Sequence, residues 1–136
     1  MTPPPPPTPA SASAPADHIT IDHILIGVKG DNGLKSTRTV AEARTFAYDL
    51  LTKLRAGADW GTAKRANSED PPPGGPYSLA DSNRGVKPSS SGEYARNSMV
   101  PAFGDVGFTL AVGEIGIADY DATTSPFGFH IIKRVK

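Results

Sequence analysis

The chain contains no cysteine, which excludes disulfide bonds, thiolate nucleophiles and zinc sites built on cysteine. It also lacks an excess of charge, because 14 basic and 14 acidic residues balance to a formal net charge of +0. No global field therefore attracts nucleic acid or anionic lipid, and we expect neither as a partner. No apolar run approaches the roughly 20 residues that a membrane-spanning helix needs.

The first 16 residues consist mostly of proline, alanine and serine, with an unbroken proline run from Pro3 to Pro7. Such a segment samples extended polyproline II and cannot offset its ordering entropy by burying apolar surface. We interpret residues 1–16 as a disordered tail, with a ligand for a proline-binding groove as the alternative. Residues 17–136 then form one folded domain, long enough for a modest core.

The N-terminal segment also has neither the basic nor the apolar region of a secretory signal. If Met1 is the native start, we expect a cytoplasmic protein. If the N-terminus was trimmed, an exported or envelope-tethered protein is the alternative, because tails of this composition often tether domains.

Hydrophobic spacing in the first half predicts one strand followed by helices. Residues 18–27 are rich in isoleucine and favour a buried strand, in which Ile21 and His23 share a face. Thr39 and Glu42 form a capping box before a helical pattern that ends at Gly57. A second short helix is expected over 59–66.

The second half predicts short strands around one more helix. Three prolines make residues 68–75 a loop, and polar residues 84–96 favour an exposed excursion. The remaining elements are a short strand at 77–79, a helix from Pro101, a strand near 117–120 and a closing strand over 127–135. This order indicates an α+β domain with a mainly antiparallel sheet.

Two histidines stand among isoleucine and leucine in the first and last strands, His23 and His130. A polar ring in such a setting is unfavourable unless it is hydrogen-bonded. One buried histidine is usually structural, but two on one small sheet can bond to each other and fix each other's tautomer. A metal site is disfavoured, because His18 is the only further histidine and no carboxylate stands at ligand spacing.

An apolar group precedes the last strand. Met99 and Phe103 are four residues apart at one helix end, and Phe127 can form another wall. Core packing explains each residue alone, but a thioether beside an aromatic ring also suits a pocket for a prolyl ring. Asp70, in the loop before the prolines, is either a turn-forming acid or a partner of the histidines.

Together these residues resemble the parvulin family of peptidyl-prolyl cis/trans isomerases over nearly all of residues 17–136. The resemblance rests on motifs in order along the chain, at residues 23–26, 57–60, 68–70, 74–75, 99–103, 113–116 and 127–132. It implies a four-stranded, mainly antiparallel sheet wrapped by about three to four helices. The chain departs from the family over 76–97, where Gly-Gly-Pro-Tyr-Ser replaces the common Gly-Gly-Asp-Leu-Gly and a longer loop precedes the methionine.

The resemblance also implies the site. His23 and His130 match the paired active-site histidines, and Asp70 stands where family members have cysteine or aspartate, so these three are the expected catalytic residues. The expected substrate-binding residues are the proline-pocket pair Met99 and Phe103, Tyr77 at a position usually filled by leucine, and Phe127 at the rim.

The implied function is rotation about X-Pro bonds in peptides and proteins by a non-covalent mechanism that assists protein folding. We expect no cofactor or metal, a monomer, and proline-containing peptides or unfolded segments as partners. The altered Gly-Gly-Pro-Tyr loop favours the alternative, a non-catalytic peptide-binding or chaperone module on the same fold. Phosphate-reading members carry a tight basic cluster after the first strand, whereas Lys29, Lys35 and Arg38 are spread out here, which disfavours a phosphorylated substrate.

Overall fold

The computed structural model describes residues 16–30, 36–70, 75–89 and 92–136. The predicted tail, except Ala16, lies outside these residues. The elements follow in the order β1 (His18–Gly27), α2 (Val40–Arg55), α3 (Trp60–Asn67), β2 (Tyr77–Ala80), η1 (Ser82–Arg84), β3 (Glu93–Ala95), η2 (Arg96–Ser98), α4 (Pro101–Gly107), β4 (Ile115–Ala118) and β5 (Gly128–Arg134).

The sheet has five strands in the order β3-β2-β1-β5-β4, where the sequence predicted four. Three of its four pairings are antiparallel, and β2 with β3 is parallel. The additional strand, β3, lies in the segment predicted as an exposed excursion over 84–96. Three residues are too few to establish a period-2 pattern, so hydrophobic alternation could not predict it.

The two faces of the sheet bury different residues, because successive side chains of a strand point to opposite sides. In β1, Ile24 and Ile26 lie on one face and His23 on the other. The register of β1 against β5 pairs His23 with Ile132 and Leu25 with His130. The two histidines therefore lie on the same face as diagonal neighbours, within reach of each other.

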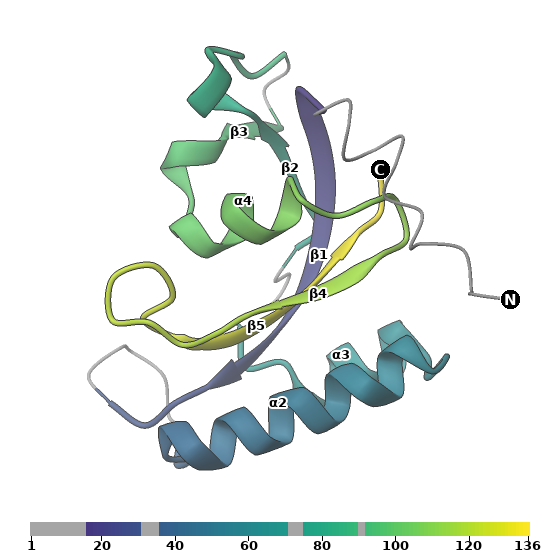
Figure 1. The fold of residues 1–136 in the computed structure, drawn as a ribbon, viewed down its shortest axis with the longest axis vertical. Coiled ribbons are helices and arrows are strands. Elements are labelled where there is room, and N and C mark those ends of the chain that lie inside the picture. Colours follow the sequence, from purple (N-terminus) through teal and green to yellow (C-terminus); the bar gives the residue numbers. More distant parts are fainter. Residues whose placement is uncertain (1–15, 31–35, 71–74, 90–91) are drawn as a thin grey trace, which may run out of the picture.

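Helix α2 covers the first face (Figure 1). The predicted capping box is present, since Thr39 Oγ1 accepts from the Glu42 amide at 3.1 Å and Glu42 Oε1 accepts from the Thr39 amide at 2.9 Å. The helix ends at Arg55, and Gly57 follows with a φ of 111°, a conformation that favours glycine. Its buried stripe packs against the strands and consists of Ala43, Ala47, Leu51 and Leu54.

Helix α3 lies beside α2 and is fixed to β1 by Asp22, which points away from the histidine face. The Asp22 carboxylate accepts from Trp60 Nε1 at 2.8 Å and from Lys64 Nζ at 2.6 Å. These charge-assisted bonds hold the helix that leads directly into the loop carrying Asp70. The position of that loop is therefore tied to the strand that carries His23.

Helix α4 covers the opposite face (Figure 1), where it packs on β4 and β5. Pro101 occupies the first turn of α4, as predicted. Ala102 and Phe103, which follow it in the helix, are buried against the sheet. Gly107 allows a close approach, because a Cβ there would lie 3.1 Å from Ile19 Cδ1. This packing brings α4 down onto the face that carries the histidines.

Candidate active site

His23 and His130 meet beneath α4. Their Nδ1 atoms lie 3.2 Å apart, and the side chains are 1% and 2% exposed, respectively. The strand register explains this contact, because diagonal neighbours on one sheet face are within reach of long side chains. The predicted histidine pair is therefore present in the structure.

Asp70 reaches this pair because its loop continues the sheet edge where β2 ends. Beyond the last β1–β2 pair, the Leu25 amide donates to Ser68 Oγ at 3.1 Å, and the Glu69 amide donates to the Leu25 carbonyl at 2.8 Å. The Gly27 amide donates to Glu69 Oε2 at 2.6 Å. Side chains and backbone of the Ser-Glu-Asp segment thus satisfy strand groups that would otherwise lack a partner.

Asp70 Oδ2 lies 3.0 Å from His23 Nε2 and accepts a hydrogen bond from the Tyr77 hydroxyl at 3.3 Å. The bond from His23 lowers the pKa of Asp70, and burial opposes this shift only in part. Burial, followed by the Asp70 charge, raises the pKa of Tyr77 to about 12. At neutral pH the site therefore holds a carboxylate and an intact phenol.

The carboxylate fixes the tautomers of both rings. An ionised Asp70 only accepts, so Nε2 of a neutral His23 carries the proton and its Nδ1 is an acceptor. His130 then donates from Nδ1, and its Nε2, which is buried and lacks a hydrogen-bond partner among the described residues, carries a lone pair. Burial lowers the pKa of His130 to about 3, and the neighbouring His23 acts in the same direction. His130 is neutral at physiological pH.

Aromatic rings enclose the pair. The Phe103 ring lies edge-on to His23 at 4.8 Å and to His130 at 4.9 Å between centroids. Tyr77 lies 5.8 Å from Phe103 and 5.6 Å from His23. Met99 is half-buried against the apolar cluster that contains Phe103. Five of the predicted site residues are therefore in mutual contact in the structure, and Met99 packs on the same apolar cluster as Phe103. The five are His23, Asp70, Tyr77, Phe103 and His130.

Two details differ from a simple open pocket. Phe103 is only 5% exposed, so the accessible part of this region is formed by the half-buried residues Asp70, Tyr77 and Met99. Phe127 lines another cavity, of about 480 Å³, with Val28 and Tyr120 beside it. Its assignment to the substrate rim stays a prediction.

Sequence reasoning did not select Tyr94 or Arg96. Tyr94 lies on β3 with its ring 6.1 Å from that of Tyr77. Arg96 binds the buried Asp81 at 3.1 Å, and a Cβ at Gly104 would overlap its side chain. Both residues lie in the segment predicted as an exposed excursion, and only the parallel pairing of β3 shows that Tyr94 borders the site.

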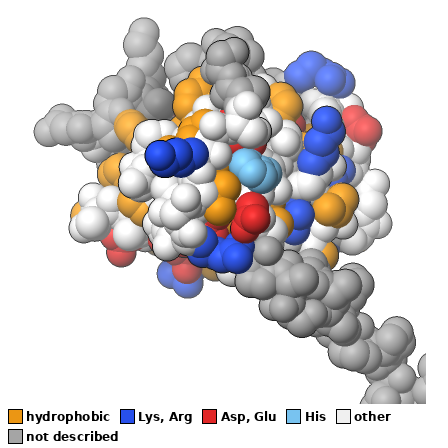
Figure 2. All heavy atoms as spheres, turned by 90° about the horizontal axis from the view of Figure 1, so that it is seen from above, with side chains coloured by type: hydrophobic (Ala, Val, Ile, Leu, Met, Phe, Trp, Pro, Cys, Tyr) orange, Lys and Arg blue, Asp and Glu red, His pale blue; other side chains and the backbone are white. Residues whose placement is uncertain are grey.

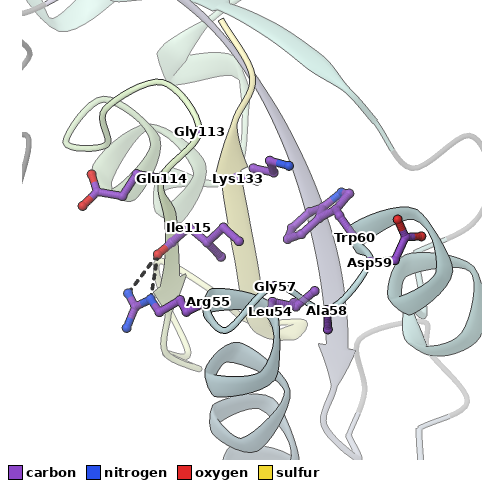
Figure 3. A pocket seen from close by; sticks show the side chains of 10 residues that line it. All are labelled: Leu54, Arg55, Gly57, Ala58, Asp59, Trp60, Gly113, Glu114, Ile115 and Lys133. Atoms are coloured by element: carbon purple, nitrogen blue, oxygen red, sulfur yellow. Dashed lines mark hydrogen bonds between the residues drawn. The ribbon is translucent and has the colours of Figure 1, made fainter.

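A larger cavity of about 600 Å³ lies elsewhere, between the C-terminal end of α2 and β4 (Figure 3). Arg55 occupies one side of it and donates to the Ile115 carbonyl at 3.0 and 2.8 Å. Lys133 lies on another side, 5.8 Å from the centre of the Trp60 ring. Because Lys133 and His130 are an odd number of residues apart on β5, this cavity is on the face opposite the histidines.

The face of the described residues that Figure 2 shows carries side chains of both charge signs. In Figure 2, basic and acidic side chains are interspersed, and hydrophobic side chains form small groups. Among the residues that the structure describes, no three histidine or carboxylate side chains are placed to hold a metal ion. Within the same residues, no helix is both long and apolar enough to cross a bilayer.

The fold and the buried histidine pair define an α+β domain of the parvulin type. A family model described as the PPIC-type PPIase domain matches residues 10–136. The chain therefore belongs to the PPIC-type peptidyl-prolyl isomerase (PPIase) family, the parvulin-type rotamases, as the sequence predicted.

A solved structure supports the fold. The solution structure of TbPIN1 matches with a TM-score of 0.61 at 20% identity, covering 89% of this chain and 99% of that chain. A search of curated protein sequences found no match. The fold class and family are confirmed, whereas the roles of the individual site residues stay predictions.

Proposed function

We propose that the chain catalyses cis/trans rotation about X-Pro bonds in peptides and unfolded protein segments. The observation that carries this proposal is the Phe103 ring packed against both His23 and His130, at 4.8 and 4.9 Å. An apolar ring and a polar network then stand side by side, which suits a substrate with an apolar prolyl ring next to a polar carbonyl.

The reaction needs selective binding of a twisted amide rather than bond breaking. The planar amide resists rotation by about 18–20 kcal/mol because its C–N bond has partial double-bond character. A rate increase of about 10⁴-fold requires roughly 5–6 kcal/mol of preferential transition-state binding. Twisting reduces the resonance and the polarity of the amide, so a water-poor site favours the twisted form.

Phe103, Met99 and Tyr77 hold the prolyl ring in this proposal. Phe103 is the buried wall, and the half-buried Met99 and Tyr77 present accessible apolar surface. Large polarisable side chains provide this contact without hydrogen-bonding to the ring. With the ring held, the chain that precedes it is the part that rotates.

The polar network acts on the carbonyl side. Asp70, His23 and His130 form one hydrogen-bonded chain, and its fixed dipoles are already oriented before substrate binds. No covalent intermediate is needed, because no group leaves and no proton must be delivered to a leaving group. His23 and Asp70 therefore act on the charge distribution of the twisted amide and do not attack the substrate as nucleophiles.

An unphosphorylated substrate fits this site. Arg38, one of the basic residues after β1, binds Glu69 at 3.3 Å and lies 4.2 Å from the centre of the Phe46 ring. A guanidinium that is already paired and stacked is a poor phosphate receptor. Catalysis is accordingly expected on peptides without phosphoserine or phosphothreonine.

A protease-coupled assay on a short unphosphorylated X-Pro peptide tests the proposal. The protease cleaves only the trans form, so catalysis accelerates the slow phase in proportion to protein concentration. Uncatalysed isomerisation takes roughly tens to hundreds of seconds. A slow phase that keeps this time constant when the protein is added contradicts the proposal. A phosphorylated version of the same peptide serves as the comparison and is expected to react no faster.

One observation favours a second candidate, a non-catalytic peptide-binding module. Phe103 is 5% exposed and Tyr77 packs beside it, so the prolyl ring has limited access to the inner wall. A module of this kind binds proline-containing peptides at the same surface without accelerating their isomerisation. Peptide titration by NMR, combined with the coupled assay, separates the two functions.

A further inference from the structure

Tyr94 is a large side chain that is 48% exposed on a strand beside the site. Its ring is not isolated in solvent, because it packs edge-on against the Tyr77 ring. The two ring centroids are 6.1 Å apart and the interplanar angle is 73°. Tyrosines that combine an exposed face with a fixed orientation are typical of binding surfaces.

The sheet register places Tyr94 on the histidine face. Tyr94 pairs with Leu79 across the parallel β2–β3 ladder, and Leu79 pairs with Ile19 across β1–β2. Paired residues share a face, and Ile19 lies on the face of His23 because the two are four positions apart, an even spacing along β1. Tyr94, Tyr77 and Phe103 therefore form a continuous aromatic row from the surface to the histidine pair.

Residues on both sides of Tyr94 are anchored. Glu93 Oε1 lies 2.9 Å from His18 Nδ1 and accepts from the Ser89 amide at 2.8 Å. On the other side, Arg96 binds Asp81 at 3.1 Å and Asp105 at 3.2 Å. A short edge strand held at both ends presents its central ring in one position, which lowers the entropy lost on binding.

We propose that Tyr94, together with the outer edge of Tyr77, forms a second substrate subsite that takes a large apolar or aromatic side chain next to the proline. This proposal rests on the proposed function, because it places the proline at Phe103. Consecutive Cα atoms are about 3.8 Å apart, and successive rings of the aromatic row are 5.8 and 6.1 Å apart, so the row is on the length scale of a residue that flanks the proline.

Charge at the site restricts the same subsite. The Asp70 carboxylate, whose pKa is lowered by His23, lies 3.3 Å from the Tyr77 hydroxyl. A glutamate or aspartate next to the proline would approach this negative charge and lose the apolar contact with the rings. The preference is therefore for aromatic over acidic side chains, with alanine between them.

Two peptide series test the proposal, one varying the residue before proline and one the residue after it, each with alanine, phenylalanine and glutamate. Turnover is measured as kcat/KM and affinity by NMR titration, for wild type, Tyr94→Ala and Tyr94→Phe. In the series whose varied residue contacts Tyr94, the kcat/KM of the wild type is expected to be about tenfold higher for the phenylalanine peptide than for the alanine peptide. Tyr94→Ala reduces that ratio toward one, and Tyr94→Phe retains it because the ring makes the contact.

Val112→Ala is the matched control, since Val112 is 63% exposed and is not part of the aromatic row. It is expected to keep the wild-type ratio. A phenylalanine-to-alanine ratio that is the same in wild type and Tyr94→Ala, in both series and both readouts, overturns the subsite. If no peptide is isomerised but affinity shows the Tyr94-dependent preference, the proposed catalysis fails and the subsite stands.

Discussion

The Nδ1 atoms of His23 and His130 lie 3.2 Å apart beneath α4 and join β1 to β5, which are the first and last strands along the chain and neighbours in the sheet. Asp70, on Nε2 of His23, makes His23 the acceptor and His130 the donor of this bond. Reversing it with both rings neutral would put the lone pair of His23 Nε2 opposite the Asp70 carboxylate, which would lose its donor from His23. One half-buried carboxylate thus sets the direction of the hydrogen bond between two buried histidines.

This arrangement predicts the tautomer of each ring. With both rings neutral, His130 is expected to carry its proton at Nδ1 alone and His23 at Nε2 alone. Long-range ¹H–¹⁵N correlation spectra of the imidazoles distinguish the two forms. Fast-averaged tautomers on both rings, or a proton on Nε2 of His130, would contradict the assignment.

The free energy of unfolding is expected to fall as pH decreases below 6.5. Burial lowers the pKa of His130 from 6.5 to about 3, so the unfolded chain binds a proton that the native chain does not. Between these two pKa values, each unit of decrease in pH lowers the free energy of unfolding by about 1.4 kcal/mol. Below 3.8 the lowered pKa of Asp70 adds to the loss, because the native carboxylate resists protonation. Urea unfolding at a series of pH values from 7 to 4 measures the slope.

His18→Gln is the control for that slope. His18 is exposed and bound to Glu93, so its removal is expected to keep the steep loss of stability. His130→Gln should flatten the curve between pH 6 and 4, even though it lowers stability at pH 7 by about 1–3 kcal/mol through the broken pair. Equal slopes in all three proteins would show that another group is responsible.

Phe103→Leu separates the aromatic wall from apolar burial. Leucine keeps much of the buried volume, so stability is expected to fall by only about 1–2 kcal/mol. The loss of both edge-on ring contacts should reduce kcat/KM on an X-Pro peptide by about tenfold or more. Val106→Ala, one turn along α4, is the control and should keep kcat/KM within about twofold. A larger kinetic effect from the control would assign the loss to general destabilisation.

Much of the fold could be predicted because its signals are local. The range of β1 matched its isoleucine-rich segment, and the capping box at Thr39 marked the start of α2. Alternation in β1 and β5 predicted which residues share a face within each strand, and the β1–β5 register then places both histidines on one face. The pairing of strands distant in the chain came from the family resemblance rather than from the residues.

The rest depends on contacts that have no local signal. Strand β3 is three residues long, and its parallel partner lies earlier in the chain. Asp70 reaches His23 through bonds from Ser68 and Glu69 to the backbone of β1, a geometry that residue spacing does not encode. The hydrogen bond from the Tyr77 hydroxyl to Asp70 likewise has no signal in the residue spacing.

Tyr77→Phe tests whether that hydrogen bond tunes the carboxylate. The Tyr77 hydroxyl is one of the groups that lower the pKa of Asp70, after His23. Its removal is expected to raise the pKa of Asp70 toward the ordinary value, while the ring contacts with Phe103 persist. A ¹³C titration of the Asp70 carboxyl group measures the change, and a further decrease in its pKa would contradict the assigned contact.

Exchange NMR on an unphosphorylated X-Pro peptide, with substoichiometric protein, tests the central claim most directly. The account predicts cross-peaks between cis and trans signals at sub-second mixing times for wild type, and their strong reduction for Phe103→Leu. The peptide alone shows none, since uncatalysed exchange takes roughly tens to hundreds of seconds. Peptide signals that shift on binding to wild type but give no cis/trans cross-peaks would contradict the account.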